Sequence, residues 1–265
     1  MEASITFKAV GKTIGKKILL ADLSFGVEKG STFVLIGENG AGKSIILKLL
    51  VGLIEKDTGS VYIHGQDISS RSLETRSMCG YMPQNINLDD DLTIFDNISI
   101  YGQLHGLTSA EARKNTLHWA ELLGFTQFLK QSPYDQAFGL QRKILFARAL
   151  VHNPDVLLLD EPYRAMDALT KSIMHESLLE VYDRTRVTIF FITHDLEEAI
   201  FLGDRVIVMT TRPARTKKIV EVKINRPRDY RLLSSEEFRI LVQETKEAVH
   251  EEAVKAFEAG ERELA

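Results

Sequence analysis

The chain has 265 residues, of which 44% are hydrophobic, so it is long enough to bury a full hydrophobic core. Its formal net charge of -4 argues against a nucleic-acid-binding protein, and its single cysteine, Cys79, excludes an internal disulfide framework and fits a reducing cytosol. We find no pattern of a signal peptide and no apolar run near the roughly 18 residues that cross a bilayer. The expectation is a soluble protein that reaches a membrane only by docking to something that crosses it.

Strand-like and helix-like segments alternate along the chain. Residues 32–36 form a short apolar run, and residues 45–53 follow it with apolar residues at helical spacing. Near-continuous apolar strands separated by helices favour a parallel sheet covered on both faces. Cys79 is expected to be a buried strand residue. The later β-rich runs are residues 156–159, 187–192 and 206–209.

Two regions differ from this α/β pattern. Residues 85–142 are polar and helical, which predicts a helical subdomain inserted between two parts of a core, residues 1–84 and 143–212. From residue 213 the chain becomes basic and proline-containing, and a final helix from about Ser235 carries one apolar stripe. Residues 213–265 are therefore predicted to be a C-terminal extension with a long amphipathic helix, which packs on its own core or on a partner subunit.

The first chemical motif is Gly37-Glu-Asn-Gly-Ala-Gly-Lys-Ser44, which matches the phosphate loop G-x-x-x-x-G-K-[ST] between a strand and a helix. Its glycines let backbone N–H groups close around phosphate oxygens, helped by the positive end of the following helix. Lys43 is expected to hold the β- and γ-phosphates, and the Ser44 hydroxyl to bind Mg²⁺. The predicted nucleotide-binding residues here are Gly37, Glu38, Asn39, Gly40, Ala41, Gly42, Lys43, Ser44 and Ile45.

The second motif, Val156-Leu-Leu-Leu-Asp-Glu-Pro162, places two acids at the end of an apolar strand. In open α/β sheets ligands bind at the carboxyl ends of the strands. Asp160 suits a water-mediated contact with Mg²⁺, and Glu161 suits a general base that polarises the attacking water. The alternative, that the two acids only cap a helix, is disfavoured by the phosphate loop in the same chain.

Together these motifs resemble the ATP-binding subunit of an ABC transporter, and the resemblance covers nearly the whole chain. It implies an α/β P-loop NTPase with a RecA-like mixed-sheet core, ATP and Mg²⁺ as ligands, and ATP hydrolysis. Gln84, in Gly80-Tyr-Met-Pro-Gln84, resembles the Q-loop glutamine that links Mg²⁺ to the helical lobe. Asp167 resembles the D-loop aspartate, and His194 resembles the switch histidine that contacts the γ-phosphate.

Two landmarks of the family are altered. The aromatic residue that usually stacks on adenine corresponds to Ile14, whose aliphatic side chain covers a base without π-stacking. The family's Leu-Ser-Gly-Gly-Gln signature, which caps the ATP held by a second cassette, falls on Asp135-Gln-Ala-Phe-Gly139. We interpret this stretch as an altered phosphate-binding helix start, in which Asp135 either approaches the triphosphate or caps the helix. The signature residues expected at the second cassette's site are Gln136, Ala137, Phe138 and Gly139.

The resemblance implies integral membrane transporter subunits and a second ATP-binding cassette as partners, at the cytoplasmic face of a membrane. Because the signature is altered, a heterodimer is favoured over a homodimer. Residues 193–205, 211–215 and 226–229 resemble importers of nitrate, sulfonates and related solutes, for which a solute-binding protein is a further expected partner.

Residues 100–108 instead resemble exporters of drugs and lipids. The importer is favoured because its resemblance is longer. The exporter stays an alternative, as does a degenerate cassette that binds ATP as a regulatory or structural partner with little hydrolysis.

Overall fold

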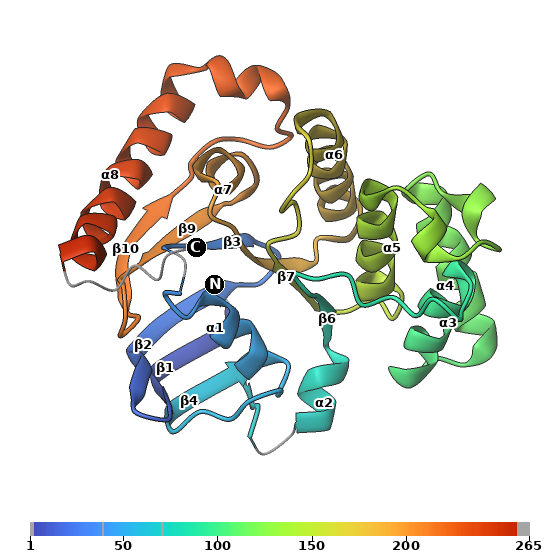
Figure 1. The fold of residues 1–265 in the computed structure, drawn as a ribbon, viewed down its shortest axis with the longest axis horizontal. Helices are drawn as coiled ribbons and strands as arrows, with labels where there is room; N and C mark the ends of the chain where they lie inside the picture. Colours follow the sequence, from blue (N-terminus) through green and yellow to red (C-terminus); the bar gives the residue numbers. More distant parts are fainter. Residues whose placement is uncertain (1–2, 39, 70–71, 259–265) are drawn as a thin grey trace. The chain divides into compact units, whose positions relative to one another are not determined.

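The computed structural model of the chain describes residues 3–38, 40–69 and 72–258 (Figure 1). The chain divides into two compact units. Unit 1 comprises residues 1–76 and 188–265, and unit 2 comprises residues 77–187. The sequence places the borders between the core, the helical subdomain and the C-terminal extension at residues 84, 142 and 212. These borders stay a prediction.

Unit 1 contains two sheets, with strand orders β2-β1-β4-β5 and β10-β9-β3-β8. The first is antiparallel throughout. The second has three parallel strands and one antiparallel edge strand, β10. The strands are β1 (Ala3–Ile14), β2 (Lys17–Glu28), β3 (Thr32–Ile36), β4 (Thr58–Ile63), β5 (Gln66–Asp67), β8 (Thr188–Ile192), β9 (Arg205–Met209) and β10 (Thr216–Glu221). The helices are α1 (Lys43–Leu50), α2 (Ser72–Ser77), which ends beside the border to unit 2, α7 (Leu196–Leu202), the 3-10 helix η3 (Tyr230–Ser234) and α8 (Glu236–Glu258).

Strand β3 is central in its sheet. All five of its residues are buried, and it pairs in parallel with β8 on one side and β9 on the other. A strand that is covered on both faces needs apolar side chains in both directions, which explains its unbroken apolar run. The same holds for β8, whose five residues are also all buried.

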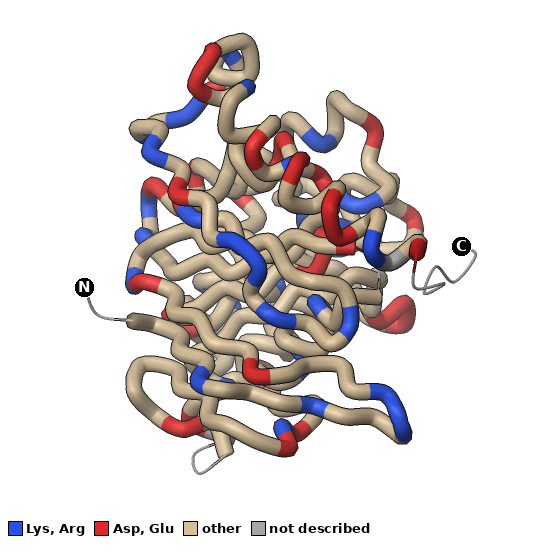
Figure 2. The backbone as a smooth tube through the Cα atoms, turned by 90° about the vertical axis from the view of Figure 1, so that its left-hand side faces the viewer, with Lys and Arg blue, Asp and Glu red and all other residues tan. Residues whose placement is uncertain are grey.

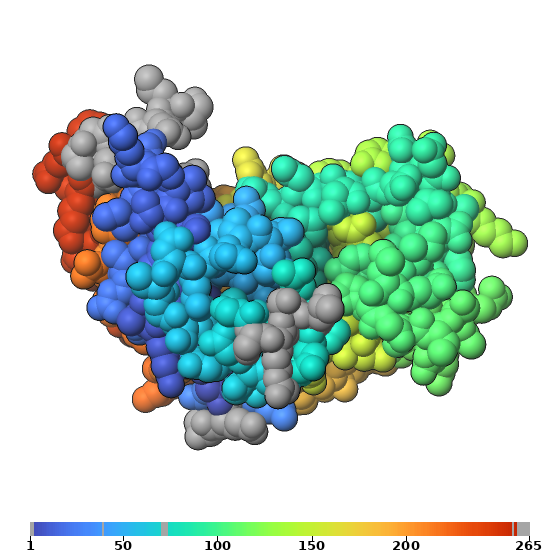
Figure 3. Space-filling view, turned by 90° about the horizontal axis from the view of Figure 1, so that it is seen from below, coloured from blue at the N-terminus to red at the C-terminus, as the bar shows by residue number. Residues whose placement is uncertain are grey.

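Stacked phenylalanines join the two sheets of unit 1 into one core. The ring centroids of Phe7 (β1) and Phe25 (β2) lie 4.5 Å apart, and those of Phe25 and Phe33 (β3) lie 5.4 Å apart. Phe33 in turn lies 5.3 Å from Phe190 of β8. Such stacks bury a large apolar area in a defined geometry. Residues of the antiparallel sheet, blue to cyan in Figure 3, form much of the surface of unit 1 on the face shown there.

Unit 2 combines two parallel strands with helices. Strand β6 (Cys79–Met82) pairs with β7 (Val156–Asp160), and α3 packs against both α4 and α5 (Figure 1). Helix α4 starts with a capping box between Thr108 and Glu111, which satisfies backbone N–H groups at the helix start. The helices are α3 (Ile94–Leu104), α4 (Ser109–Leu122), η1 (Thr126–Phe128), η2 (Pro133–Asp135), α5 (Phe138–Leu150) and α6 (Ala168–Thr185).

Cys79 is a buried strand residue, as predicted, and burial together with the charge of Asp155 raises the pKa of its thiol to about 12. A thiol with this pKa stays protonated at neutral pH, so Cys79 is structural and unreactive.

Two arginines fasten the C-terminal extension to the core of unit 1. Arg228 donates to the carbonyls of Phe201 (3.1 Å) and Gly203 (2.7 Å), at the carboxyl end of α7. Arg226 and Arg228 both pair with Asp204, at 3.0 and 3.3 Å. Cations are favourable at the negative end of a helix, so this basic stretch holds the extension in place.

Helix α8 packs against α7, β9 and β10. Its buried positions are Phe238, Thr245, Ala248 and Glu252, so the buried face is partly polar. Phe257, at the end of the predicted apolar stripe, is 68% exposed, so this end of the stripe does not pack on the core of its own chain. A buried carboxylate takes a place on the face that the pattern assigned to apolar residues.

Acidic and basic residues are interspersed along both units (Figure 2). Among the described residues, no helix is both long and apolar enough to span a membrane.

Candidate nucleotide-binding site

The phosphate loop of unit 1 lies between β3 and α1, as its motif predicts. Gly40 and Gly42 have φ of 81° and 92°, in the left-handed region that favours glycine. Gly42 is also the N-cap of α1, and a Cβ there would lie 3.3 Å from Leu20 Cδ2. The loop is thus tightly bent and ends at a helix N-terminus, which is the arrangement that binds phosphate. The predicted residue Asn39 lies outside the described residues.

Lys43 lies within this loop. It is only 6% exposed, and its Nζ donates to the carbonyls of Gly37 (2.7 Å) and Glu38 (2.9 Å). Ser44 and Ile45 follow in the first turn of α1, both half-buried. The loop backbone therefore holds the ammonium group at the place where a phosphate chain is expected.

His194 follows β8, the parallel neighbour of β3. Leu35 and Ile192 pair across these strands, so the phosphate loop and His194 leave the same edge of the sheet. The bend that carries His194 is held by Thr193 Oγ1, which donates to Glu198 at 2.6 Å, and by Asp195, which caps α7. His194 itself is exposed.

In unit 2, Gln84 and the two acids follow neighbouring strands. Met82 of β6 pairs with Leu159 of β7, so Gln84, Asp160 and Glu161 meet at one sheet edge. Gln84 Nε2 donates to Glu161 Oε2 at 3.1 Å. The structure thus brings the two predicted catalytic residues of this unit into direct contact, while Asp160 is 3% exposed beside them.

The backbone of Glu161 is strained, since its φ is 45°. Non-glycine residues in this region cost on the order of 1 kcal/mol or more and concentrate at functional sites. Arg164 Nε lies 3.8 Å from Glu161 Oε2, a neighbour that the sequence analysis missed. Its spacing of three residues from Glu161 was the only signal for this contact.

Helix α5 starts at the altered signature without Asp135 as its N-cap. The N-cap is Ala137, whose side chain cannot accept a hydrogen bond, and Asp135 belongs to the 3-10 turn η2. The alternative that Asp135 caps this helix is therefore wrong, whereas its approach to a triphosphate stays a prediction. Gln136 Nε2 donates to Gln131 Oε1 (2.8 Å) and to the Ser132 carbonyl (3.3 Å). Its amide N–H groups are thus engaged within its own segment.

Phe138 and Gly139 form the first turn of α5. Phe138 is 40% exposed, and the guanidinium of Arg142 lies 5.2 Å from its ring centroid. Arg142 also donates to the Pro83 carbonyl at 3.2 Å, next to Gln84. This arginine therefore links the altered signature to the segment that carries Gln84, which is predicted to be catalytic.

Asp167 and Gly139 approach each other through Thr170. Asp167 is the N-cap of α6 and accepts from the Thr170 N–H (3.0 Å) and hydroxyl (2.6 Å). A Cβ at Gly139 would lie 2.6 Å from Thr170 Cγ2, so α5 and α6 need glycine at this approach. Unit 2 thus brings the predicted D-loop residue next to the signature.

The residue predicted to contact the adenine base, Ile14, ends β1 beside the Gly15 turn and is 50% exposed.

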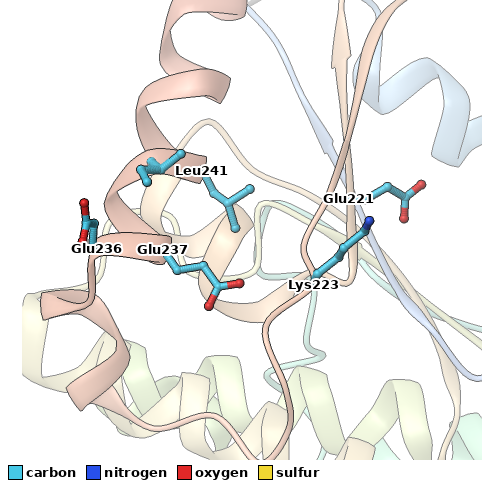
Figure 4. A pocket seen from close by; sticks show the side chains of 6 residues that line it. Glu221, Lys223, Glu236, Glu237 and Leu241 are labelled. Carbon is cyan, nitrogen blue, oxygen red and sulfur yellow. The ribbon is translucent and has the colours of Figure 1, made fainter.

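An open groove of about 560 Å³ lies elsewhere in unit 1, under the start of α8 (Figure 4). Acidic side chains border it from both α8 and the end of β10. Its lining residues are Glu221, Lys223, Glu236, Glu237, Ile240 and Leu241.

The chain matches a known protein family and several known proteins. The family model described as ABC transporter matches residues 20–164. The chain is similar to the nitrate import ATP-binding protein NrtD of Synechococcus elongatus, with 35% identity over 230 residues, 84% of this chain and 82% of the relative. It is also similar to the aliphatic sulfonates import ATP-binding protein SsuB of Bacillus cereus, with 34% identity over 232 residues, 88% and 90% of the two chains.

Solved structures resemble the fold at lower identity. The dimeric cassette MJ0796 has a TM-score of 0.73 at 24% identity and covers 83% of this chain and 100% of its own. The structure of cbiO1 from Clostridium perfringens has a TM-score of 0.77 at 20% identity, with 94% and 98% covered. At these identities the likeness shows the fold alone.

Proposed function

This chain belongs to the ABC transporter family, and from that premise we propose that it powers the import of a small solute through separate membrane subunits. The family, the P-loop cassette fold and the role of an ATP-binding ATPase subunit are those predicted from the sequence, and they are confirmed. One observation carries the importer: the relatives named for nitrate and sulfonate import match over 82% and 90% of their length.

The proposed reaction uses Glu161 as the general base. Its carboxylate would take a proton from water as the water oxygen attacks the γ-phosphorus, and the bond from that phosphorus to the bridging oxygen breaks to give ADP and phosphate. Gln84, which donates to Glu161, would orient the carboxylate. Lys43 would balance the phosphate charge, and His194 would contact the γ-phosphate.

The donor set also fits Mg²⁺. The hydroxyl of Ser44, the amide oxygen of Gln84 and the buried carboxylate of Asp160 are oxygen ligands, which this hard cation prefers. When bound, the ion would neutralise charge on the β- and γ-phosphates.

The altered signature supports a heterodimer. Side chains at Ala137 and Phe138 hinder the close backbone approach that glycines allow, and the amide of Gln136 is held by Gln131 and Ser132. A second cassette with an unaltered signature would complete the ATP site of this chain. The same contacts favour the second candidate, a cassette that binds ATP as a regulatory or structural partner with little hydrolysis.

The proposed place of work is the cytoplasmic face of a membrane, where the chain docks peripherally on its transporter subunits. A tagged chain should co-purify from native membranes with an integral membrane subunit and a different cassette. If the complex is an importer, a solute-binding protein should co-purify as well. Cells that lack the chain should lose uptake of nitrate or of an aliphatic sulfonate, and Lys43→Ala should not restore it. If cells that lack the chain still took up both solutes, and the chain co-purified with a drug or lipid exporter, the importer would be contradicted.

A further inference from the structure

The segment between β9 and β10 lies directly on the phosphate loop of unit 1. Arg212 Nε donates to the Gly40 carbonyl at 2.5 Å. A Cβ at Gly40 would lie 2.9 Å from Arg212 Nη2, and one at Gly42 would lie 3.7 Å from the Cβ of Ala214. A guanidinium group thus rests against the backbone of the loop that binds nucleotide phosphates.

This segment is fixed by its own backbone and by β2. The Thr210 N–H donates to the Arg215 carbonyl (3.0 Å), and the Arg215 N–H donates to Thr210 Oγ1 (2.9 Å). The Ala214 N–H donates to Leu19 at 2.8 Å, and its carbonyl accepts from Ala21 at 3.2 Å. Arg212 is therefore presented to the phosphate loop by a rigid turn.

Helix α8 holds the same turn from the other side. The Thr211 N–H donates to Glu252 Oε2 at 3.1 Å, and Glu252 is only 2% exposed. The second oxygen, Oε1, pairs with Lys217 (3.0 Å) and Lys255 (2.8 Å). A buried carboxylate is costly unless it is paired and hydrogen-bonded, so these contacts fix its position.

The charge state of Glu252 agrees with this role. Burial alone would raise the pKa of its carboxyl group, but hydrogen bonds from Lys255, Lys217 and the Thr211 N–H outweigh burial and lower the pKa. The carboxylate is therefore ionised at neutral pH, and it accepts from the residue next to Arg212.

We propose that Arg212 is a positioning residue of the phosphate loop, and that helix α8, through Glu252 and Thr211, sets how tightly the loop binds a nucleoside triphosphate. The hydrogen bond from Arg212 holds the Gly40 carbonyl, and the Ala41 N–H of the same peptide donates to the Glu38 carbonyl at 3.2 Å, so the cation fixes the bend of the loop that is expected to hold phosphate. The guanidinium also adds positive charge close to an anionic ligand. The proposal rests on ATP binding at this loop and adds the C-terminal helix as a control on its affinity.

The first test measures the dissociation constant of ATP on the full chain by calorimetry. Arg212→Ala should weaken binding about tenfold, the order expected for losing one charge-assisted hydrogen bond. Arg212→Lys should recover part of this loss because it keeps the charge. Arg215→Ala, an exposed residue of the same turn, is the matched control and should stay within about twofold of the wild type.

Unchanged affinity in Arg212→Ala would overturn the proposal. A wild-type chain that binds no ATP would instead contradict the nucleotide site itself, and Lys43→Ala, which removes a direct phosphate contact, reports on that site separately.

The second test concerns α8. Glu252→Ala should weaken ATP binding as Arg212→Ala does, and the double variant should lose no more than either single variant, because both changes act on one path. Glu251→Gln is the control, since Glu251 pairs with Lys217 at 2.7 Å but is exposed. Additive losses would overturn the role of α8.

A third measurement keeps the proposal testable if Glu252→Ala does not fold. Binding coupling is reciprocal, so ATP should slow amide hydrogen exchange at Thr211 and over residues 248–255 of the wild-type chain. This protection should disappear in Arg212→Ala. Exchange in α8 that ATP does not change would contradict the coupling.

Discussion

Glu161 combines a strained backbone, a hydrogen bond from Gln84 and a nearby Arg164. As the proposed general base, it should be needed for the chemical step and dispensable for binding. Glu161→Gln keeps the size of the side chain and an oxygen that can accept from Gln84. We expect hydrolysis to fall by about 10²-fold or more, the range for losing a positioned base, with ATP affinity unchanged.

Steady-state ATPase assays of the co-purified complex, together with ATP binding, check this assignment. Lys43→Ala is the contrasting variant, because it removes a charge from the ground-state phosphates and should weaken binding itself. A complex that hydrolyses ATP and keeps its full rate with Glu161→Gln would show that another group is the base.

Ile14 offers an aliphatic surface where the family usually has an aromatic ring. It is half exposed at the end of β1. Ile14→Tyr should tighten ATP binding by about 0.5–1.5 kcal/mol, the scale of an aromatic stacking contribution. Discrimination between ATP and GTP by the wild type should stay within about tenfold, or roughly 1.4 kcal/mol.

Ile18→Tyr is the matched control for this change. Ile18 is similarly exposed on the same hairpin but pairs with Thr13, whereas Ile14 pairs with Lys17, so the two side chains point to opposite faces. Equal ATP affinities of the wild type and Ile14→Tyr would place the base contact elsewhere.

A pair of stacked histidines ties α3 to the segment after α5. The rings of His105 and His152 have centroids 4.0 Å apart, and His152 Nε2 lies 3.1 Å from the Cys79 carbonyl. Burial, and then the positive charge of protonated His105, lower the pKa of His152 to about 4, although the contact with Cys79 opposes this. Neutral His152 is therefore the form that the folded chain prefers.

The sign of the resulting pH dependence follows. In the unfolded chain His152 has a pKa near 6.5, so between pH 6.5 and about 4 the unfolded state binds more protons. The contribution of His152 to the free energy of unfolding is fully present above pH 6.5. It is lost as the pH falls through this window, by at most about 3 kcal/mol.

Denaturant unfolding at several pH values between 4 and 7 measures this effect. His152→Asn should flatten the pH dependence relative to the wild type, whereas His118→Asn, at an exposed position on α4, should not. Parallel curves for the wild type and His152→Asn would contradict the prediction.

At the scale of elements, burial on both faces decided which strands could be predicted. The apolar runs at residues 32–36, 156–159, 187–192 and 206–209 correspond to β3, β7, β8 and β9, which carry apolar side chains on both faces. Strands β1 and β2 gave no such signal, because they are half exposed and their pairing contains several register shifts. Bulges of this kind interrupt the alternation by which an exposed strand is recognised.

In the candidate site, too, features with a local sequence pattern could be predicted and features that depend on packing could not. The positions of the phosphate loop, Gln84 and Glu161 could be predicted because each follows a strand end within a local motif. The contacts of Arg212 with Gly40 and of Glu252 with Thr211 join residues far apart in sequence. They depend on how α8 and the β9–β10 turn pack, which a helical pattern does not specify. The internal hydrogen bonds of Gln136 depend in the same way on the fold of η2.

At the scale of the whole assembly, the altered signature affects which ATP sites of a pair of cassettes can work. In a pair of cassettes, the signature of each cassette contacts the ATP that the other binds. The altered residues 136–138 would therefore face the nucleotide bound by the partner. A mixed complex would then keep one working site, built from this chain's phosphate loop and Glu161 and from the partner's signature. A homodimer would have two impaired sites and hydrolyse ATP slowly.

Restoring Ser at 136 and Gly at 137 and 138 separates these assemblies. In a mixed complex the triple change should alter ATP turnover by less than about twofold, because the working site does not use these residues. In a homodimer formed by linking two copies, it should raise turnover about tenfold or more, the effect of regaining hydrogen bonds to a charged phosphate. Steady-state ATPase rates of the two purified assemblies provide the measurement.

Glu161→Gln gives the matching control, since it should stop the mixed complex whether or not the signature is restored. Copy number in the native complex is the independent check. Two copies of this chain, no second cassette and brisk ATP hydrolysis would contradict the asymmetric arrangement, because Ala137, Phe138 and the engaged amide of Gln136 would then stand at both active sites. The asymmetric arrangement, a mixed complex with one working ATP site, requires two results. The native complex should hold one copy of this chain beside a cassette with an unaltered signature, and its ATPase rate should not depend on residues 136–138.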